Sequence, residues 1–210
     1  MKFASRQAAG RRLGKWLRQC DVSADIVLGL PRGGAVVAAE VARELGLPLD
    51  VLVVRKIGHP LQREYAIGAI AEPDVLMLDE TAITGFPVAR QQLDAVIAEE
   101  TVRLNEYCSR FHPSKAVTLN NKTVLLVDDG LATGASAEAA VFSVRRQKPR
   151  RIIVAAPVAS TSAFDKLARA ADKVMVLVAD PHFGAVGQYY ENFAQTTDEE
   201  VVALLSHVVP

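Results

Sequence analysis

The chain has 210 residues, with 24 Lys or Arg against 24 Asp or Glu, so its formal net charge is zero. This length suits one large domain with a buried core, and we expect residues 1–210 to form a single domain. The balanced charge provides no overall field for nucleic acid or an anionic membrane. We therefore expect neither as a partner, and any anion site must be local.

The first 20 residues are basic but contain no long apolar run, which argues against a secretory signal or a membrane anchor. Cys20 and Cys108 are far apart and lack metal-ligand spacing, which favours free thiols in a reducing compartment, and we expect a cytoplasmic protein. Apolar residues near the start recur at helical spacing and predict a packing helix with a basic outer face rather than a transit peptide: Ala9, Leu13, Trp16, Leu17 and Cys20.

Five short runs are rich in Val, Ile and Leu and lack polar alternation, which is typical of strands buried on both faces. Helical patterns lie between them. The alternation predicts an α/β fold, with a doubly wound, mostly parallel sheet and helices on both faces. The predicted strands cover residues 25–30, 49–54, 123–128, 151–157 and 173–179, and the helices cover 33–46, 86–110, 135–148, 160–170 and 197–208.

Residues 55–80 interrupt this alternation, because two glycines and two prolines prevent a convincing helix. Apolar runs on either side of Pro73 predict a hairpin. The polar stretch 57–65 has few apolar anchors and is predicted to be a mobile loop above the sheet, so its functional interpretation is a lid. His59 lies in this loop beside a proline and is assigned no role.

Two adjacent acids, Asp128 and Asp129, follow a central strand at its carboxyl end, where open α/β sheets bind ligands. Residues 130–136 then form the turn into a helix, whose first amides and dipole attract phosphate. The spacing matches neither a P-loop nor a dinucleotide loop. Because carboxylates accept hydrogen bonds from hydroxyls, a ribose 5-phosphate fits both halves of this segment.

A second anion loop is predicted at residues 29–34, with the sequence GLPRGG, between a strand and a helix. Gly33 and Gly34 allow backbone amides to face an anion, and Arg32 supplies a forked, permanently charged donor. The basic run at 145–151 is interpreted more simply as a solvated helix end.

Residues 124–136 resemble the PRPP-binding motif of the type I phosphoribosyltransferases, and residues 29–34 resemble the pyrophosphate loop of that family. The resemblance implies that Asp128 and Asp129 hold the ribose hydroxyls, and that Arg32, Gly33 and Gly34 hold pyrophosphate, in a loop where one non-proline peptide bond is often cis. The implied 5′-phosphate loop comprises Gly130, Leu131, Ala132, Thr133, Gly134, Ala135 and Ser136.

The resemblance also assigns roles elsewhere. It implies that residues of about 56–68 form the flexible loop, with Lys56 binding pyrophosphate and, like Arg32, stabilising charge. It implies a small hood-like segment at about 180–196, whose Phe183, Tyr189 or Tyr190 could stack on a base. Alternatively, these rings seal the open edge of the sheet. Mg²⁺ is expected, held mainly by PRPP and water rather than by protein ligands.

The function implied is a Mg²⁺-dependent phosphoribosyltransferase that transfers the 5-phosphoribosyl group of PRPP to a nitrogenous base and releases pyrophosphate. Two alternatives stay open: a non-catalytic regulator that senses PRPP, and a hydrolase on the same scaffold. The acceptor base is not indicated. Homodimers are common in the family and the amphipathic helices offer surfaces for one, but the sequence does not indicate the oligomeric state.

Overall fold

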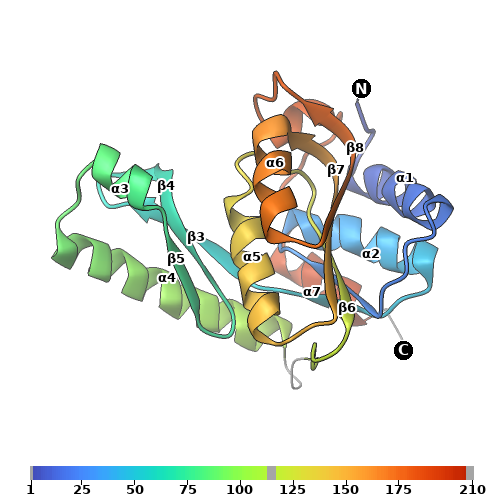
Figure 1. Cartoon of the computed structure of the whole chain (residues 1–210), viewed down its shortest axis with the longest axis horizontal. Helices are drawn as coiled ribbons and strands as arrows, with labels where there is room; N and C mark the ends of the chain where they lie inside the picture. Colours follow the sequence, from blue (N-terminus) through green and yellow to red (C-terminus); the bar gives the residue numbers. More distant parts are fainter. Residues whose placement is uncertain (1, 113–116, 207–210) are drawn as a thin grey trace.

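The centre of the protein is a five-stranded parallel sheet, in a computed structural model that describes residues 2–112 and 117–206 (Figure 1). The neighbouring strands are all parallel, in the order β2-β1-β6-β7-β8. The predicted α/β sheet is therefore confirmed. Its strands are β1 (Ile26–Gly29), β2 (Leu49–Val51), β6 (Thr123–Val127), β7 (Arg151–Ser160) and β8 (Lys173–Asp180).

Helices cover both faces of this sheet. One face carries α1 (Arg6–Gln19) and α2 (Gly33–Leu45), and the other carries α5 (Ala135–Arg146) and α6 (Thr161–Ala170). Successive residues of β6 alternate between these layers, so that Leu126 packs with α5 and α6 while Leu125 packs with α1 and α2. All of β6 is buried. This explains why its sequence is continuously apolar.

A second sheet, antiparallel, extends away from the core (Figure 1). It contains β3 (Val54–His59), β4 (Gln62–Ala71) and β5 (Val75–Leu78), and is followed by α3 (Glu80–Gly85) and α4 (Arg90–Phe111). We call residues 54–111 the arm. A hydrophobic cluster fills the space between this sheet and α4 and continues into the rest of the protein through Ala35, Val51 and Val201. Its members in the arm include Ile57, Ile67, Ile70, Leu93, Val96 and Leu104.

The arm corrects one prediction. The sequence predicts a loop at residues 57–65, but β3 and β4 pair there with only Pro60 and Leu61 at the turn. A β-bulge next to Gly58 brings the chain so close that a Cβ there would lie 2.1 Å from the carbonyl oxygen of Arg63. His59 is fully buried and stacks on Phe86, with 3.9 Å between ring centroids. The hairpin at Pro73 is confirmed.

His112 joins the base of the arm to the core. Its Nδ1 lies 3.4 Å from Oδ1 of Asp50 in β2, and its Nε2 lies 3.1 Å from Oε1 of Glu72 in the β4–β5 turn. These two carboxylates raise the pKa of His112 to about 10. The imidazole is therefore protonated at neutral pH and held between two anions. Glu72 also accepts a hydrogen bond from the Sγ of Cys108, at 3.3 Å.

The chain ends in a helix that lies between core and arm. After the short 3₁₀ helix η1 (Val186–Tyr189), α7 (Asp198–Ser206) packs beside α2 and α4 (Figure 1). The last two positions of the predicted helix 197–208 lie outside the described residues. Within the described ranges, no helix has both the length and the apolar character needed to cross a bilayer.

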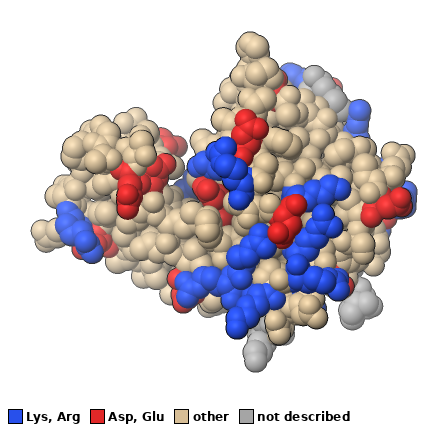
Figure 2. Space-filling view, viewed as in Figure 1, with Lys and Arg blue, Asp and Glu red and all other residues tan. Residues whose placement is uncertain are grey.

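Basic side chains gather on the face that carries α5 and α6 (Figure 2). The run 145–151 contains exposed arginines, three of which are ion-paired: Arg145 with Asp172, Arg146 with Asp74, and Arg150 with Asp25. Cations at the carboxyl end of α5 also suit the helix dipole. The run thus lies at the opposite end of α5 from the two predicted ribose-binding acids.

Candidate functional site

The two predicted motifs meet at one place. Asp128 and Asp129 leave β6 at its carboxyl end and lie against the turn that follows β1. A Cβ atom on Gly33 would lie 2.0 Å from Oδ2 of Asp129, and one on Gly34 would lie 2.8 Å from Oδ1 of Asp128. Only glycine allows the backbone to approach the carboxylates this closely. The start of α2 and the acid pair therefore form a single site.

The surroundings disfavour negative charge on both acids. Burial, followed by the neighbouring charge of Asp129, raises the pKa of Asp128. Burial also raises the pKa of Asp129, against the opposing effect of its hydrogen bond from Arg6. Two desolvated carboxylates side by side are costly unless donors reach them. The arrangement suits a ligand that donates hydrogen bonds.

Arg6, in the first turn of α1, is a site residue that the sequence analysis misses. Its Nε donates to Oδ2 of Asp129 at 2.6 Å, and its Nη1 donates to the carbonyl oxygen of Ala194 at 2.7 Å. The ring of Phe193 lies 3.8 Å from its Cζ. A cation is unfavourable in the first turn of a helix because of the helix dipole. Its presence there therefore suggests that it has an anionic partner outside the helix. That signal alone could not have identified Asp129.

The predicted phosphate loop, residues 130–136, forms the turn into α5. Leu131 is buried and fixed to β7, since its N–H donates to the carbonyl of Val158 and its own carbonyl accepts from Ser160, each at 2.9 Å. Gly134 has a φ of 73° and precedes α5 without a side chain to cap it. The N–H of Ala135 donates to Oγ1 of Thr133 at 3.4 Å, so the amides of Ser136 and Ala137 are the ones suited to bind an external anion. Thr133 is exposed beside them.

The two predicted cations lie on different sides of the site, and of the two only the charge of Lys56 acts on the acids. Arg32 precedes α2, and the Pro31–Arg32 peptide bond is cis, as the resemblance implies. Lys56 is exposed on β3. Its positive charge partly opposes the rise in pKa that burial causes at Asp128 and Asp129. The arm therefore brings Lys56 towards the acid pair, although as part of a strand rather than of a loop.

The aromatic residues after β8 pack against the core. Tyr190 is buried, and its hydroxyl donates to the carbonyl oxygen of Asp129 at 2.6 Å. Tyr189 is also buried, donates to Oδ2 of Asp180 at 2.6 Å and stacks on Phe183. These contacts favour the packing alternative for the two tyrosines. Stacking of a base on the half-buried Phe183 stays a prediction.

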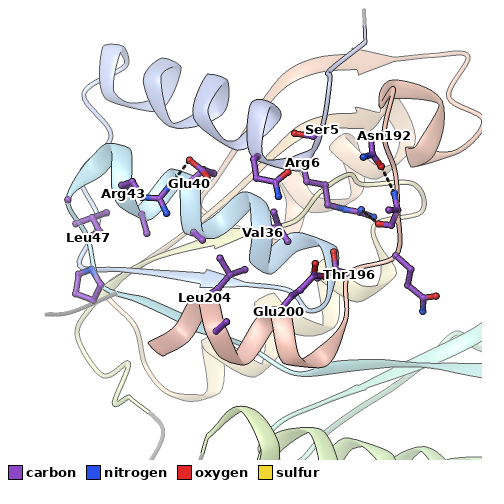
Figure 3. Close-up of a pocket in the computed structure, with 18 residues that line it drawn as sticks. Ser5, Arg6, Val36, Glu40, Arg43, Leu47, Asn192, Thr196, Glu200 and Leu204 are labelled. Carbon is purple, nitrogen blue, oxygen red and sulfur yellow. Dashed lines mark hydrogen bonds and ion pairs between the residues drawn. The ribbon is translucent and has the colours of Figure 1, made fainter. Parts of the chain in front are cut away.

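A cavity of about 900 Å³ lies between α1, α2 and α7 (Figure 3). Val36 and Leu204 contribute apolar surface, while Glu40 and Arg43 form an ion pair on α2. Its lining residues, all from the described part of the chain, include Arg6 but neither of the two acids nor Lys56. The cavity is therefore distinct from the predicted ligand site and shares only Arg6 with it.

Residues 4–193 match the family model of the phosphoribosyl transferase domain. The chain belongs to this family. Two curated relatives from Mycobacterium tuberculosis, strains H37Rv and CDC 1551, are each 42% identical over 204 residues. The H37Rv protein is named "Putative phosphoribosyl transferase Rv0571c". The match covers 97% of this chain and 46% of each relative, so the chain spans about half the length of the curated relatives it matches.

Solved structures support the same fold. TT1426 from Thermus thermophilus is 42% identical, with a TM-score of 0.81 and 98% of each chain covered. APRTase from Giardia lamblia, complexed with 9-deazaadenine, is 14% identical, with a TM-score of 0.50 and coverage of 84% of this chain and 80% of its own. The latter likeness concerns the fold alone. The match to the phosphoribosyl transferase model ends at residue 193, so α7 lies outside it.

Proposed function

We propose that this phosphoribosyl transferase binds PRPP with Mg²⁺ and transfers its 5-phosphoribosyl group to a nitrogenous base. The observation that carries the proposal is the contact of Gly33 and Gly34 with the carboxylates of Asp129 and Asp128. The contact places the N-terminus of α2 beside two carboxylates that can accept hydrogen bonds from hydroxyls, close to the N-terminus of α5. In this arrangement, ribose hydroxyls donate to the acids, the 5′-phosphate accepts from amides before α5, and pyrophosphate accepts from amides before α2.

The proposed reaction requires that the two substrates are positioned for attack and that negative charge on the leaving pyrophosphate is stabilised. A base nitrogen forms a bond to ribose C1 and loses its proton to water, while the bond from C1 to the pyrophosphate oxygen breaks and its electron pair leaves with pyrophosphate. Arg32 and Lys56 are the cations suited to stabilise the charge that develops on the leaving group. The enzyme interpretation rests on these two residues, because the predicted lid loop is a strand pair instead.

Mg²⁺ fits this site as an ion held mainly by PRPP oxygens and water. Among the described residues, no group of three or more His, Cys, Asp or Glu side chains is arranged to hold a metal ion. The protein oxygens suited to complete its coordination are those of Asp128 and Asp129. When bound, Mg²⁺ would neutralise charge on the pyrophosphate group.

The test is calorimetric titration with Mg²⁺-PRPP. We expect the parent to bind, and the double variant Asp128→Asn/Asp129→Asn to bind at least tenfold more weakly, because each charge-assisted hydrogen bond is worth about 1.5–3 kcal/mol. Asp165→Asn, which removes an exposed carboxylate on α6, serves as the matched control and should bind like the parent. Absence of PRPP binding by the parent, or normal binding by the double variant, would contradict the proposal.

A screen of nitrogenous bases for PRPP-dependent release of pyrophosphate then identifies the acceptor. Transfer requires release that depends on one base or class of bases. Release without any base would indicate a hydrolase, and PRPP binding without release would indicate a sensor.

A further inference from the structure

Asp198, the first residue of α7, connects the start of α2 with the arm. Its Oδ2 accepts a hydrogen bond from Nη1 of Arg110 in α4, at 2.6 Å. Its Oδ1 lies 3.7 Å from Nη1 of Arg32, the predicted pyrophosphate ligand. The side chain of Asp198 is only 14% exposed. One carboxylate of the chain's last described helix therefore faces two arginines from distant segments.

The two oxygens of this carboxylate are held differently. Oδ1 is buried and has no hydrogen-bond partner among the described residues, whereas buried carboxylate oxygens usually accept at least one hydrogen bond. At 3.7 Å, Arg32 forms an ion pair with it but no hydrogen bond. Because Arg110 fixes Oδ2, the carboxylate is anchored. The guanidinium of Arg32, with 36% of its side chain exposed, is the partner with room to adjust.

We propose that Asp198 is a positioning residue, which orients the guanidinium of Arg32 for pyrophosphate. The inference rests on the proposed function. Asp198 attracts the Nη1 side of the guanidinium and leaves Nε and Nη2 to donate to phosphate oxygens. An arginine that is oriented before the anion arrives loses less freedom on binding. Arg110 thus holds the carboxylate of Asp198, and this carboxylate orients Arg32. The two contacts connect the arm to the predicted pyrophosphate loop.

A purely structural role for Asp198 is the competing interpretation. Asp198, Glu199 and Glu200 all lie in the first turn of α7, where acids stabilise a helix through its dipole. If this were the whole role of Asp198, its loss would resemble the loss of Glu199. It would also act independently of Arg32. The two interpretations therefore differ in the coupling between Asp198 and Arg32.

A double-mutant cycle on the affinity for Mg²⁺-pyrophosphate separates them. The proteins are the parent, Asp198→Asn, Arg32→Gln, the double variant, and Glu199→Gln as a control with the same charge change in the same turn. We expect Asp198→Asn to weaken binding about 3- to 10-fold, within the range of direct side-chain couplings. Glu199→Gln should bind like the parent. In the Arg32→Gln background, Asp198→Asn should cause no further loss.

Several results would overturn the inference: unchanged or tighter binding by Asp198→Asn, an equal loss in Glu199→Gln, or an additive loss in the double variant. Thermal melting of each protein shows whether a loss of binding merely follows from unfolding. If the parent itself did not bind Mg²⁺-pyrophosphate, the proposed function would fail together with the inference. If both the parent and Asp198→Asn bound Mg²⁺-pyrophosphate normally, the inference about Asp198 would be wrong, but the proposed function would stand.

Discussion

At the scale of single residues, the acid pair lowers the stability of the folded protein. Burial raises the pKa of Asp128 above the value of an unfolded chain, so the ionised carboxylate is less stable in the folded than in the unfolded state. The resulting loss of stability is absent at low pH, where the acid is protonated in both states. It grows as the pH rises through the unfolded pKa and towards the folded pKa.

Asp128→Asn should therefore raise the melting temperature at pH 7. The asparagine Oδ1 keeps the acceptor for the Asp129 N–H, which lies 2.8 Å from Oδ1 of Asp128, and asparagine has no ionisation that burial can penalise. Each kcal/mol recovered corresponds to about 2–4 °C for a chain of this size. Calorimetric melting at pH 7 and pH 4 checks this, since the gain should shrink at the lower pH. An unchanged or lower melting temperature at pH 7 would contradict it.

At the scale of elements, His112 is the joint between α4, the β4–β5 turn and β2. Its folded pKa of about 10 lies above its unfolded value near 6.5. The stabilisation that it contributes is fully present below the unfolded pKa. It is lost progressively as the pH rises from about 6.5 towards 10. The thiol of Cys108, whose pKa is raised to about 12 by burial and by Glu72, stays protonated throughout this range.

Replacing this joint should cost stability in a pH-dependent way. We expect His112→Gln to lower the free energy of unfolding by about 1–2 kcal/mol at pH 6, because it leaves two partly buried carboxylates, whose interaction with the imidazole is weakened by solvent, without their cation. The difference from the parent should decline above pH 7 and be small at pH 10. Urea unfolding of both proteins at pH 6, 8 and 10 gives the comparison. If the difference in unfolding free energy between parent and variant stayed constant with pH, protonated His112 would not be stabilised by Asp50 and Glu72.

Elements with a strong local signal could be predicted from the sequence. The continuous apolar run of β6 and the two acids after it needed no tertiary information, and α5 follows from the helical pattern beyond Gly134. The pairing of β3 with β4 was not predictable, because its apolar anchors are sparse and their partners come from α4. Arg6 was missed for a similar reason, since its partners are Asp129 and Ala194, far along the chain.

At the scale of the whole molecule, core and arm share α5. Ala139 packs against Ala69, Ala71 and Val75 of the arm, while Ala140 and Val141 on the same helix pack in the core. The candidate site lies where these two parts meet, since the core contributes Asp128 and the arm contributes Lys56. The ligand proposed for this site would contact both parts. Its binding energy should therefore stabilise the molecule as one unit.

Saturating Mg²⁺-PRPP should raise the melting temperature in a single transition. At a ligand concentration of 100 times Kd, the linked stabilisation is about 2.7 kcal/mol, which corresponds to roughly 5–10 °C. Differential scanning calorimetry with and without the ligand measures this shift. Asp128→Asn/Asp129→Asn, which should bind at least tenfold more weakly, should show at most about half of this shift at the same concentration. Two transitions, of which only one moved, would show that core and arm respond separately.

The contact of Arg6 with Asp129 and Ala194 also has a consequence for biosynthesis. A ribosome completes Asp129 well before Ala194, and at 5–20 residues per second the interval is roughly 3–13 s. During that time Arg6 has neither the carbonyl of Ala194 nor the ring of Phe193 to hold it in place. A nascent chain that stops before residue 193 could still form the parallel strands around β6, yet it would lack the clamp on its acid pair. We therefore expect the candidate site to be completed only after residue 194 has been synthesised, later than the strands that support it.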